Sequence, residues 1–159
     1  MKYLQMLQIL KTNKILQSIE DKHPSLTIDF EVFSCKSSKK QKLYLKYNKP
    51  LRYLLETLQL AFPDYNFTKE TESDFLKVSY QEIANELIYA FIVFHKNKED
   101  VVKFVEFLGV IIDKTVHLDD CQIYKYINRN GPFEKCVWFF SFLFYSKKDK
   151  RVLMLNFKC

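Results

Sequence analysis

The first half of the chain carries apolar residues at helical and strand spacings in turn. Residues 2–17 place apolar side chains about every 3.6 positions, which predicts an amphipathic helix. Residues 26–32 alternate apolar and polar side chains and predict a strand with one buried face. Pro50 can open a second, leucine-rich helix, because proline suits the first helical turn, and Pro63 ends it.

Two more helices are predicted in the middle of the chain. Ser79 and Glu82 form a candidate capping box, in which each side chain satisfies a free backbone N–H of the other residue. The helix that they open runs to about His95. It is apolar almost all round from Leu87 onward, so we expect it to be deeply buried. A shorter amphipathic helix follows over residues 99–114.

The last forty or so residues predict three strands, over residues 122–127, 137–145 and 151–157. The middle strand is apolar on both faces, with Trp138, Phe140, Phe142 and Phe144 on one and Phe139, Leu143 and Tyr145 on the other. A strand of this kind needs cover on both sides and belongs in the interior of a sheet. The connections are short enough for hairpins, which predicts an antiparallel meander.

These elements together predict an α/β protein of the α+β type. We expect a single compact domain over residues 1–159, with a mainly antiparallel sheet of about four to five strands and helices packed on its faces. The longest unbroken apolar run, Leu87–Phe94, is far shorter than a membrane helix requires. With no secretory signal at the N-terminus, the sequence is typical of a soluble intracellular protein without a membrane partner.

The charge of the chain is positive and unevenly placed. The formal net charge is +6, which favours acidic partners such as nucleic acid or an acidic protein surface. Residues 36–49 hold six lysines and no acidic residue. A second basic cluster contains Lys147, Lys148, Lys150 and Arg151. Either cluster can also be read as an ordinary solvated surface.

Little in the sequence predicts catalysis, a cofactor or a metal. Only Gly109 and Gly131 are present, whereas phosphate-binding loops need several glycines for close backbone approach. The three histidines have no nucleophile or acid at a telling spacing, and the four cysteines lack the close pairs of a zinc site. We expect a non-enzyme with reduced thiols, although a hydrolase or metalloenzyme assembled only in space stays open.

Four segments stand in a recognisable order along the chain: Phe33–Lys36, Pro63–Phe67, Cys121–Tyr126 and Trp138–Arg151. In this order they resemble the motifs of the Maf-one family of RNA polymerase III repressors. The signature residues are Pro63, Asp64, Tyr65, Phe67, Trp138, Phe140, Phe144 and Tyr145. We expect them to be mainly structural, with Tyr65 and Phe67 as core anchors. Asp64 should shape the turn after Pro63 by bonding nearby backbone N–H groups.

The resemblance implies a compact α/β protein without catalytic activity. Such a protein binds RNA polymerase III near its clamp and prevents recruitment to promoters by the initiation factor TFIIIB. It acts in the nucleus and cytoplasm and shuts down the synthesis of transfer RNA and 5S ribosomal RNA under stress. The family pattern divides the chain into an N-terminal box over residues 1–36, a short connector over 37–49 and a main part over 50–159.

The chain departs from the family pattern in two places. About a dozen residues, Ser37 to Lys49, stand where many members carry a long phosphorylatable insertion. The chain also stops soon after the last predicted strand, where many members continue into an acidic tail.

Two basic segments are the expected partner-binding sites. In the predicted hairpin these are Lys147, Lys148, Lys150 and Arg151, which rigid strands can present to an acidic surface. In the connector they are Lys39, Lys40 and Lys42, which could serve as a nuclear-import signal, contact nucleic acid or simply be solvated. The alternative function is a small basic nucleic-acid-binding protein that uses both segments.

Overall fold

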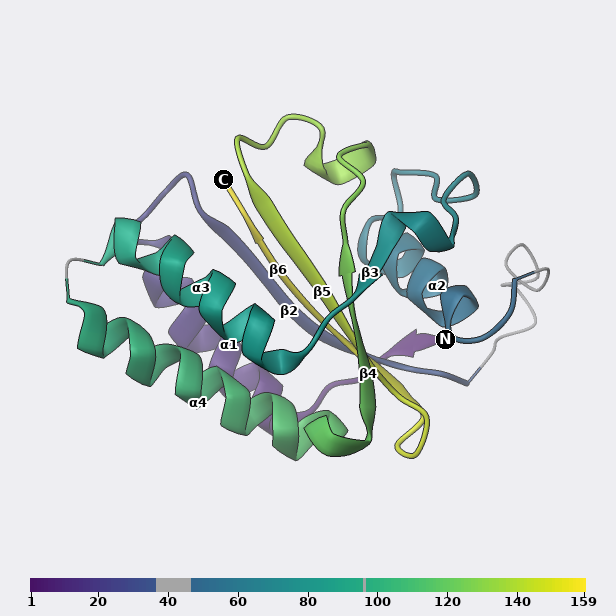
Figure 1. Cartoon of the computed structure of the whole chain (residues 1–159), viewed down its shortest axis with the longest axis horizontal. Coiled ribbons are helices and arrows are strands. Elements are labelled where there is room, and N and C mark those ends of the chain that lie inside the picture. The colour runs from purple at the N-terminus through teal and green to yellow at the C-terminus, as the bar shows by residue number, and fades with distance from the viewer. Residues whose placement is uncertain (37–46, 96) are drawn as a thin grey trace.

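An antiparallel sheet forms the centre of the molecule (Figure 1). The computed structural model describes residues 1–36, 47–95 and 97–159, and these residues contain six strands in the order β1-β2-β6-β5-β4-β3. Their bounds are Lys2–Tyr3, Thr27–Ser34, Phe75–Lys77, Cys121–Tyr126, Phe139–Ser146 and Arg151–Lys158 for β1 to β6. The expected α+β fold is confirmed. The two extra strands, β1 and β3, are too short to show a pattern of alternation.

Within the described ranges, four α-helices cover the two faces of the sheet. They are α1 (Leu7–Glu20), α2 (Leu51–Ala61), α3 (Tyr80–Phe94) and α4 (Lys98–Val116), with short 3-10 turns η2 (Glu72–Asp74), η3 (Leu118–Asp120) and η4 (Gly131–Phe133). Helices α1, α3 and α4 pack on one face, and α2 packs on the other (Figure 1). None of the described helices is long and apolar enough to cross a membrane.

The first helix begins later than its apolar pattern predicts. Lys2 and Tyr3 pair with Phe33 and Ser34 at the edge of the sheet, so α1 starts only at Leu7. Pairing with the neighbouring strand satisfies backbone groups that helix formation would otherwise have to satisfy.

Strand β5 lies in the interior of the sheet, as its two apolar faces predict. It pairs with β6 on one side and with β4 on the other, in an antiparallel meander. Phe142 and Phe144 face the core beneath α1, α3 and α4, whereas Leu143 and Tyr145 face the core beneath α2. The sheet therefore separates two apolar cores, one beneath α1, α3 and α4 and the other beneath α2.

Helix α3 begins as predicted but is not deeply buried. The Ser79 backbone N–H donates to the Glu82 carboxylate at 2.6 Å, and the Glu82 N–H donates to the Ser79 hydroxyl at 3.3 Å, which confirms the capping box. The expected deep burial is wrong, because Tyr89 is 76% exposed and Val93 is 81% exposed. The helix lies on the outside of the sheet, so only one stripe of its apolar surface can face the core.

Helices α3 and α4 approach each other closely at Gly109. An added Cβ at this position would overlap the Tyr80 hydroxyl oxygen and lie 3.0 Å from the ring carbon Cζ. The same hydroxyl donates to the Val105 carbonyl at 3.2 Å. A glycine in α4 therefore leaves room for a ring that joins the two helices.

We expect Gly109→Ala to lower the free energy of unfolding by about 1–2 kcal/mol. Alanine gains about 1 kcal/mol of helix propensity over glycine, but overpacking costs about 1–3 kcal/mol and the Tyr80 hydrogen bond is lost as well. Urea unfolding monitored by circular dichroism measures the difference. Adding Tyr80→Phe to Gly109→Ala removes the closest overlap and should recover part of the loss. An alanine variant that is more stable than the parent would contradict this packing.

A basic hairpin as the candidate partner interface

The β5–β6 hairpin turns between Ser146 and Arg151. The Ser146 hydroxyl donates to the Asp149 carboxylate at 2.8 Å and accepts from the Asp149 backbone N–H at 3.1 Å. Lys150 has a φ of 52°, in the left-handed region, and its carbonyl accepts from the Cys35 N–H at 2.8 Å. These contacts give the turn a defined conformation and attach it to the chain that follows β2.

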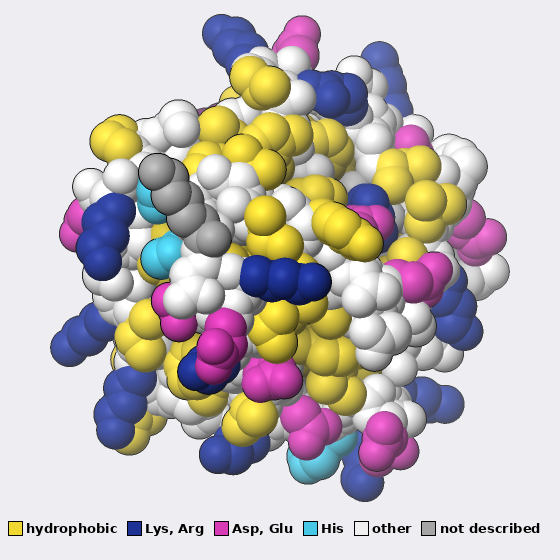
Figure 2. All heavy atoms as spheres, turned by 60° about the vertical axis from the view of Figure 1, so that its left-hand side comes forward, with side chains coloured by type: hydrophobic (Ala, Val, Ile, Leu, Met, Phe, Trp, Pro, Cys, Tyr) yellow, Lys and Arg dark blue, Asp and Glu magenta, His cyan; other side chains and the backbone are white. Residues whose placement is uncertain are grey.

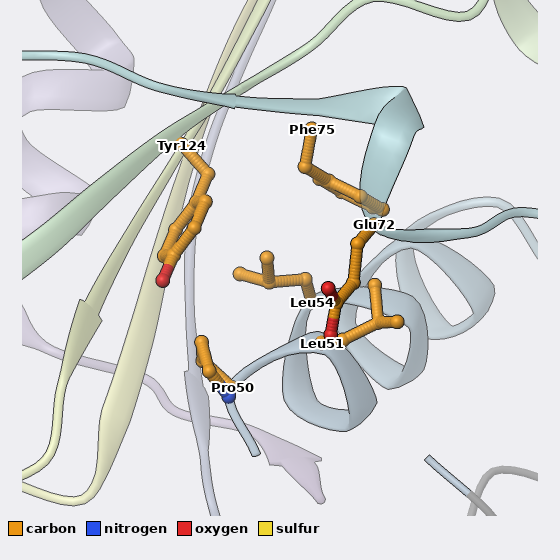
Figure 3. Close-up of a pocket in the computed structure, with 6 residues that line it drawn as sticks. All are labelled: Pro50, Leu51, Leu54, Glu72, Phe75 and Tyr124. Carbon is orange, nitrogen blue, oxygen red and sulfur yellow. The ribbon is translucent and has the colours of Figure 1, made fainter. Parts of the chain in front are cut away.

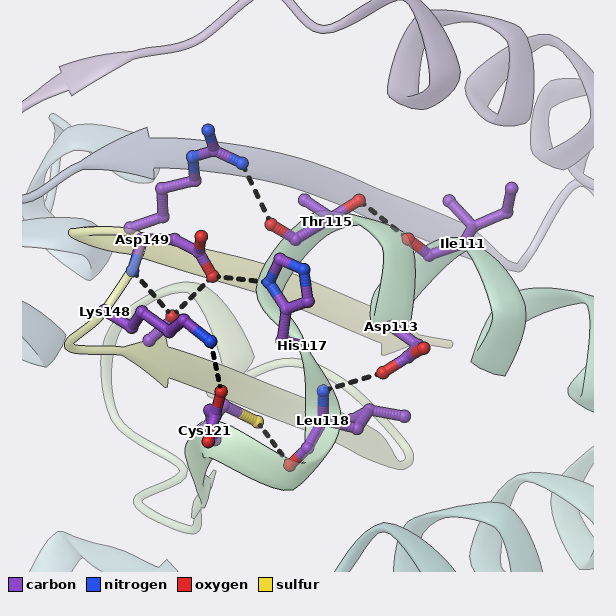
Figure 4. A network of polar contacts seen from close by, with 11 residues as sticks. Ile111, Asp113, Thr115, His117, Leu118, Cys121, Lys148 and Asp149 are labelled. Carbon is purple, nitrogen blue, oxygen red and sulfur yellow. Dashed lines mark hydrogen bonds and ion pairs between the residues drawn. The ribbon is translucent and has the colours of Figure 1, made fainter.

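The hairpin is also tied to the end of α4 by a histidine and a carboxylate (Figure 4). Nδ1 of His117 lies 2.9 Å from Oδ2 of Asp149. His117, with a φ of 52°, ends α4, and Asp113 accepts from the next N–H, that of Leu118, at 2.9 Å. The hydrogen bond with His117 is the largest cause that lowers the pKa of Asp149. The carboxylate is therefore ionised at neutral pH and holds the turn against α4.

Two of the four predicted binding cations are used within the protein itself. Arg151 donates to the carbonyl of Thr115, in the last turn of α4, at 3.0 Å. Lys148 pairs with Asp120 at 2.9 Å, and this hydrogen bond raises the pKa of Lys148. Both contacts are drawn in Figure 4. They hold the hairpin in position, a role that sequence spacing did not reveal.

Lys147 and Lys150 are the two cations that the hairpin presents outward. Both are exposed, and neither forms an ion pair with another described residue. They lie three residues apart on a turn whose backbone is held by Asp149 and Ser146. A cation on a rigid turn loses little conformational freedom on binding, apart from that of its own side chain. The structure thus provides a small, preorganised basic tip.

Ser146, Asp149 and His117 do not form a hydrolytic triad. In such a triad the histidine lies between the hydroxyl and the acid, so that it can take the hydroxyl proton. Here the hydroxyl and the imidazole both bond to Asp149, and Ser146 is fully buried. The described residues also contain no group of three or more histidines, cysteines or acids that could hold a metal ion. The four cysteines are free thiols.

The other predicted binding lysines are those of the connector. Lys39, Lys40 and Lys42 lie outside the described residues, which resume at Tyr47. Their part in binding stays a prediction.

The aromatic residues of the family signature pack the two cores. The Trp138 ring lies 5.8 Å from that of Phe94 and 5.5 Å from that of Phe140, between the sheet and α3. Phe144 is fully buried in the same core. On the opposite face, the Tyr145 ring lies 5.7 Å from that of Tyr53 in α2. These side chains therefore pack against the sheet, on its two faces.

The proline-aspartate-tyrosine segment contributes one core anchor rather than two. Phe67 is 1% exposed, and its ring lies 6.3 Å from the ring of Tyr126. The expectation for Tyr65 is wrong, because this side chain is 43% exposed and lies over Gly131 at the surface. Both residues follow the exposed Pro63 in one turn, and only the second reaches back to the sheet.

The turn after Pro63 is not held by Asp64. Its exposed carboxylate makes no hydrogen bond with a described residue, so the expected role is wrong. Instead, the Gln59 side chain donates to the Tyr65 carbonyl at 2.8 Å, and Asn66 accepts from the Thr68 N–H at 2.9 Å. An asparagine side chain can shape a turn in the same way as an aspartate. Asp64 therefore points to solvent and is available for an external contact.

A cavity of about 320 Å³ lies between α2 and the edge of the sheet that β3 forms (Figure 3). Its lining comes from the start of α2, from η2 and β3, and from β4: Pro50, Leu51, Leu54, Glu72, Phe75 and Tyr124. The volume is at the low end of ligand pockets. The sequence did not indicate this cavity, because its walls come from three separate segments. None of the predicted site residues lines it.

The chain is similar in sequence to known proteins. A family model described as Maf1 regulator matches residues 21–156. An uncharacterised protein of Encephalitozoon cuniculi (strain GB-M1) is 48% identical over 156 residues, which cover 98% of this chain and 96% of the relative. The "Repressor of RNA polymerase III transcription" of Dictyostelium discoideum is 33% identical over 114 residues, and the match covers 70% of this chain and 40% of that protein.

The fold comparison agrees. A crystal structure of citrus MAF1 superposes with a TM-score of 0.70 and 25% identity, covering 89% of this chain and 96% of that one. The four motifs that suggested the family thus lie in a fold that the family shares, with the match running along most of the chain. This chain belongs to the Maf1 regulator family.

Proposed function

We propose that this protein is a non-catalytic repressor of RNA polymerase III transcription. In this proposal it binds the polymerase near its clamp and blocks recruitment to promoters marked by TFIIIB, and it acts in the nucleus and cytoplasm. The observation that carries the proposal is the family match over residues 21–156. It is supported by relatives in Dictyostelium discoideum and Schizosaccharomyces pombe that are named as repressors of this transcription.

The mechanism that fits this structure is steric. The domain is a sheet with an apolar core on each face, and its hairpin tip carries Lys147 and Lys150 on a turn held by hydrogen bonds between Ser146 and Asp149. Charges at the rim of an interface mainly set the rate and orientation of encounter with an acidic surface. Apolar and polar contacts around them then supply the affinity. A bound domain of this size would occlude polymerase surface needed for promoter assembly.

Direct binding to nucleic acid receives less support from the hairpin. Lys148 is paired with Asp120, and Asp149 lies between Lys147 and Lys150 in the chain. Affinity for nucleic acid depends on how many phosphates the protein neutralises, because each contact releases counterions. A tip with two available cations should therefore bind duplex DNA and transfer RNA weakly and with a shallow dependence on salt concentration.

The proposal predicts polymerase binding and selective inhibition. Purified protein should form a complex with RNA polymerase III from its own cell at micromolar concentration, measured by mass photometry. It should inhibit transcription of a transfer-RNA gene that depends on TFIIIB, and it should do so without hydrolysing nucleotide. RNA polymerase II from the same cell is the control for selectivity.

A tailed template separates the steric mechanism from general inhibition. Polymerase loads on such a template without TFIIIB, so inhibition there should be much weaker than at the promoter. Lack of polymerase binding at micromolar concentration would refute the proposal. Tight, steeply salt-dependent binding to transfer RNA together with no polymerase complex would favour the nucleic-acid alternative instead.

A further inference from the structure

A groove runs along the outer seam between α3 and α4. It consists of two adjoining hollows of about 210 and 230 Å³, which share Ile88 and Val102 as lining residues. Figure 2, which brings forward the end where α3 meets α4, shows apolar side chains on this face with charged side chains among them. Ile88, Ile92 and Val102 form the apolar part of the seam, and Gln81 and Asn85 line it beside them.

The two ends of the groove carry opposite charges. Lys98 lines the hollow at the C-terminal end of α3, and Glu106 lines the hollow at its N-terminal end. Both are exposed, and neither forms an ion pair with a described residue. They lie eight residues apart on α4, about 12 Å at 1.5 Å per residue, with Val102 midway between them.

This arrangement is complementary to itself. A two-fold axis perpendicular to α4 at Val102 would bring Lys98 of each copy to Glu106 of the other. The contact would then contain two ion pairs. Symmetric dimers require this property, because the same patch on both subunits must match itself when reversed. A groove with equal charges at both ends would repel its own copy.

An exposed aromatic side chain lies close to the middle of the groove. Tyr89, which is 76% exposed, lines the hollow at the Lys98 end and follows Ile88, which lines both hollows. The axis that pairs the charges therefore passes near Tyr89, and it would bring the Tyr89 rings of the two copies close together. A large exposed aromatic near the centre of a contact is a typical anchor of a protein interface.

We propose that two copies of this chain associate through the α3–α4 groove as an antiparallel, two-fold dimer. The contact covers Tyr89 and Ile92, pairs Lys98 with Glu106 of the second copy, and has Val102 on the axis. The basic hairpin stays accessible, since it lies at the opposite end of α4, about 20 Å along the helix from Val102. Dimerisation is independent of the proposed polymerase binding.

Charge reversal tests whether Lys98 of one copy pairs with Glu106 of the other. Loss of the fold cannot explain a dimer that a second reversal restores. Sedimentation equilibrium of the full chain measures the dimer dissociation constant. Lys98→Glu alone and Glu106→Lys alone should each weaken the dimer at least about tenfold, because both pairs become repulsive. The double variant Lys98→Glu/Glu106→Lys should restore it. An equimolar mixture of the two single variants should form a heterodimer, because each then supplies what the other lacks.

A second pair of variants tests the aromatic anchor. Tyr89→Ser should weaken the dimer at least about tenfold, whereas Val93→Ser should have little effect. Val93 is 81% exposed on the same helix and lines neither hollow, so it is the matched control. Sedimentation as a monomer up to a few hundred micromolar would overturn the proposal. A dimer that ignores both charge reversals, or that the double variant fails to restore, would overturn it equally.

Discussion

Replacing Tyr126 with alanine is expected to lower the free energy of unfolding by about 3–5 kcal/mol, the range for removing a large buried aromatic. Tyr126 is fully buried, and its ring packs 5.2 Å from that of Phe75 and 5.9 Å from that of Phe133. In the core beneath α2, the Tyr126 ring joins β4 to Phe75 of β3, to Phe133 of η4 and to Phe67. Because small domains are stable by only about 5–15 kcal/mol, this variant should be close to unfolding.

The Tyr126 hydroxyl makes a separate and smaller contribution. It donates to Oε1 of Glu70 at 3.3 Å, and Glu70 is itself 6% exposed. Burial is the main cause that raises the pKa of Tyr126, which keeps the phenol neutral and able to donate. Tyr126→Phe should therefore cost about 1–3 kcal/mol, the penalty for removing a donor from a buried acceptor.

Urea unfolding, followed by circular dichroism and by fluorescence, measures the free energy of unfolding of these variants. Tyr124→Ala is the matched control, because Tyr124 lies two residues earlier on the same face of β4 but is only partly buried. Its loss should be clearly smaller than that of Tyr126→Ala. If the free energy of unfolding of Tyr126→Ala were within about 1 kcal/mol of that of the parent, with the same slope against urea concentration, the role of Tyr126 in the core would be contradicted.

Reversing the two outward charges of the hairpin is expected to weaken polymerase binding about 10- to 100-fold. Lys147→Glu/Lys150→Glu places two negative charges where the proposed interface meets an acidic surface, and like charges across an interface are strongly unfavourable. The fold should be unaffected, since both side chains are exposed and neither pairs with a described residue. Titration of labelled protein with RNA polymerase III, at two salt concentrations, measures the change.

The control for this variant is Lys11→Glu/Lys14→Glu. These lysines are also three residues apart and exposed, but they lie on α1, away from the hairpin. The control changes the net charge by the same amount, so it separates a local contact from long-range attraction. Equal weakening by the two variants would show that the hairpin is not the contact.

Local signals in the sequence predicted those features that depend on neighbours along the chain. The capping box at Ser79 and Glu82 follows from two residues three positions apart, and the structure confirms it. The interior position of β5 follows from apolar residues on both faces, because such a strand has no face suited to water. The four family motifs follow from residue types in order, and the family is confirmed.

Predictions that depended on contacts between distant segments were less successful. The apolar run of α3 indicated burial, yet burial depends on which surfaces the sheet can cover, and Tyr89 and Val93 lie outside that surface. Asp64 has the residue type of a turn former, but Asn66 performs this role in its place. The cavity between α2, β3 and β4 has no counterpart in any single segment.

The basic hairpin shows most clearly what the sequence determined and what the tertiary structure determined. The sequence by itself determined that four cations gather between two strands, because turn residues and strand alternation are local properties. Only the tertiary structure decided their use: the end of α4 and η3 bring Thr115 and Asp120 to Arg151 and Lys148. Hydrogen bonds and ion pairs act over a few ångströms, so which cations are engaged depends on packing between segments some thirty residues apart. Lys147 and Lys150 are what that packing leaves for a partner.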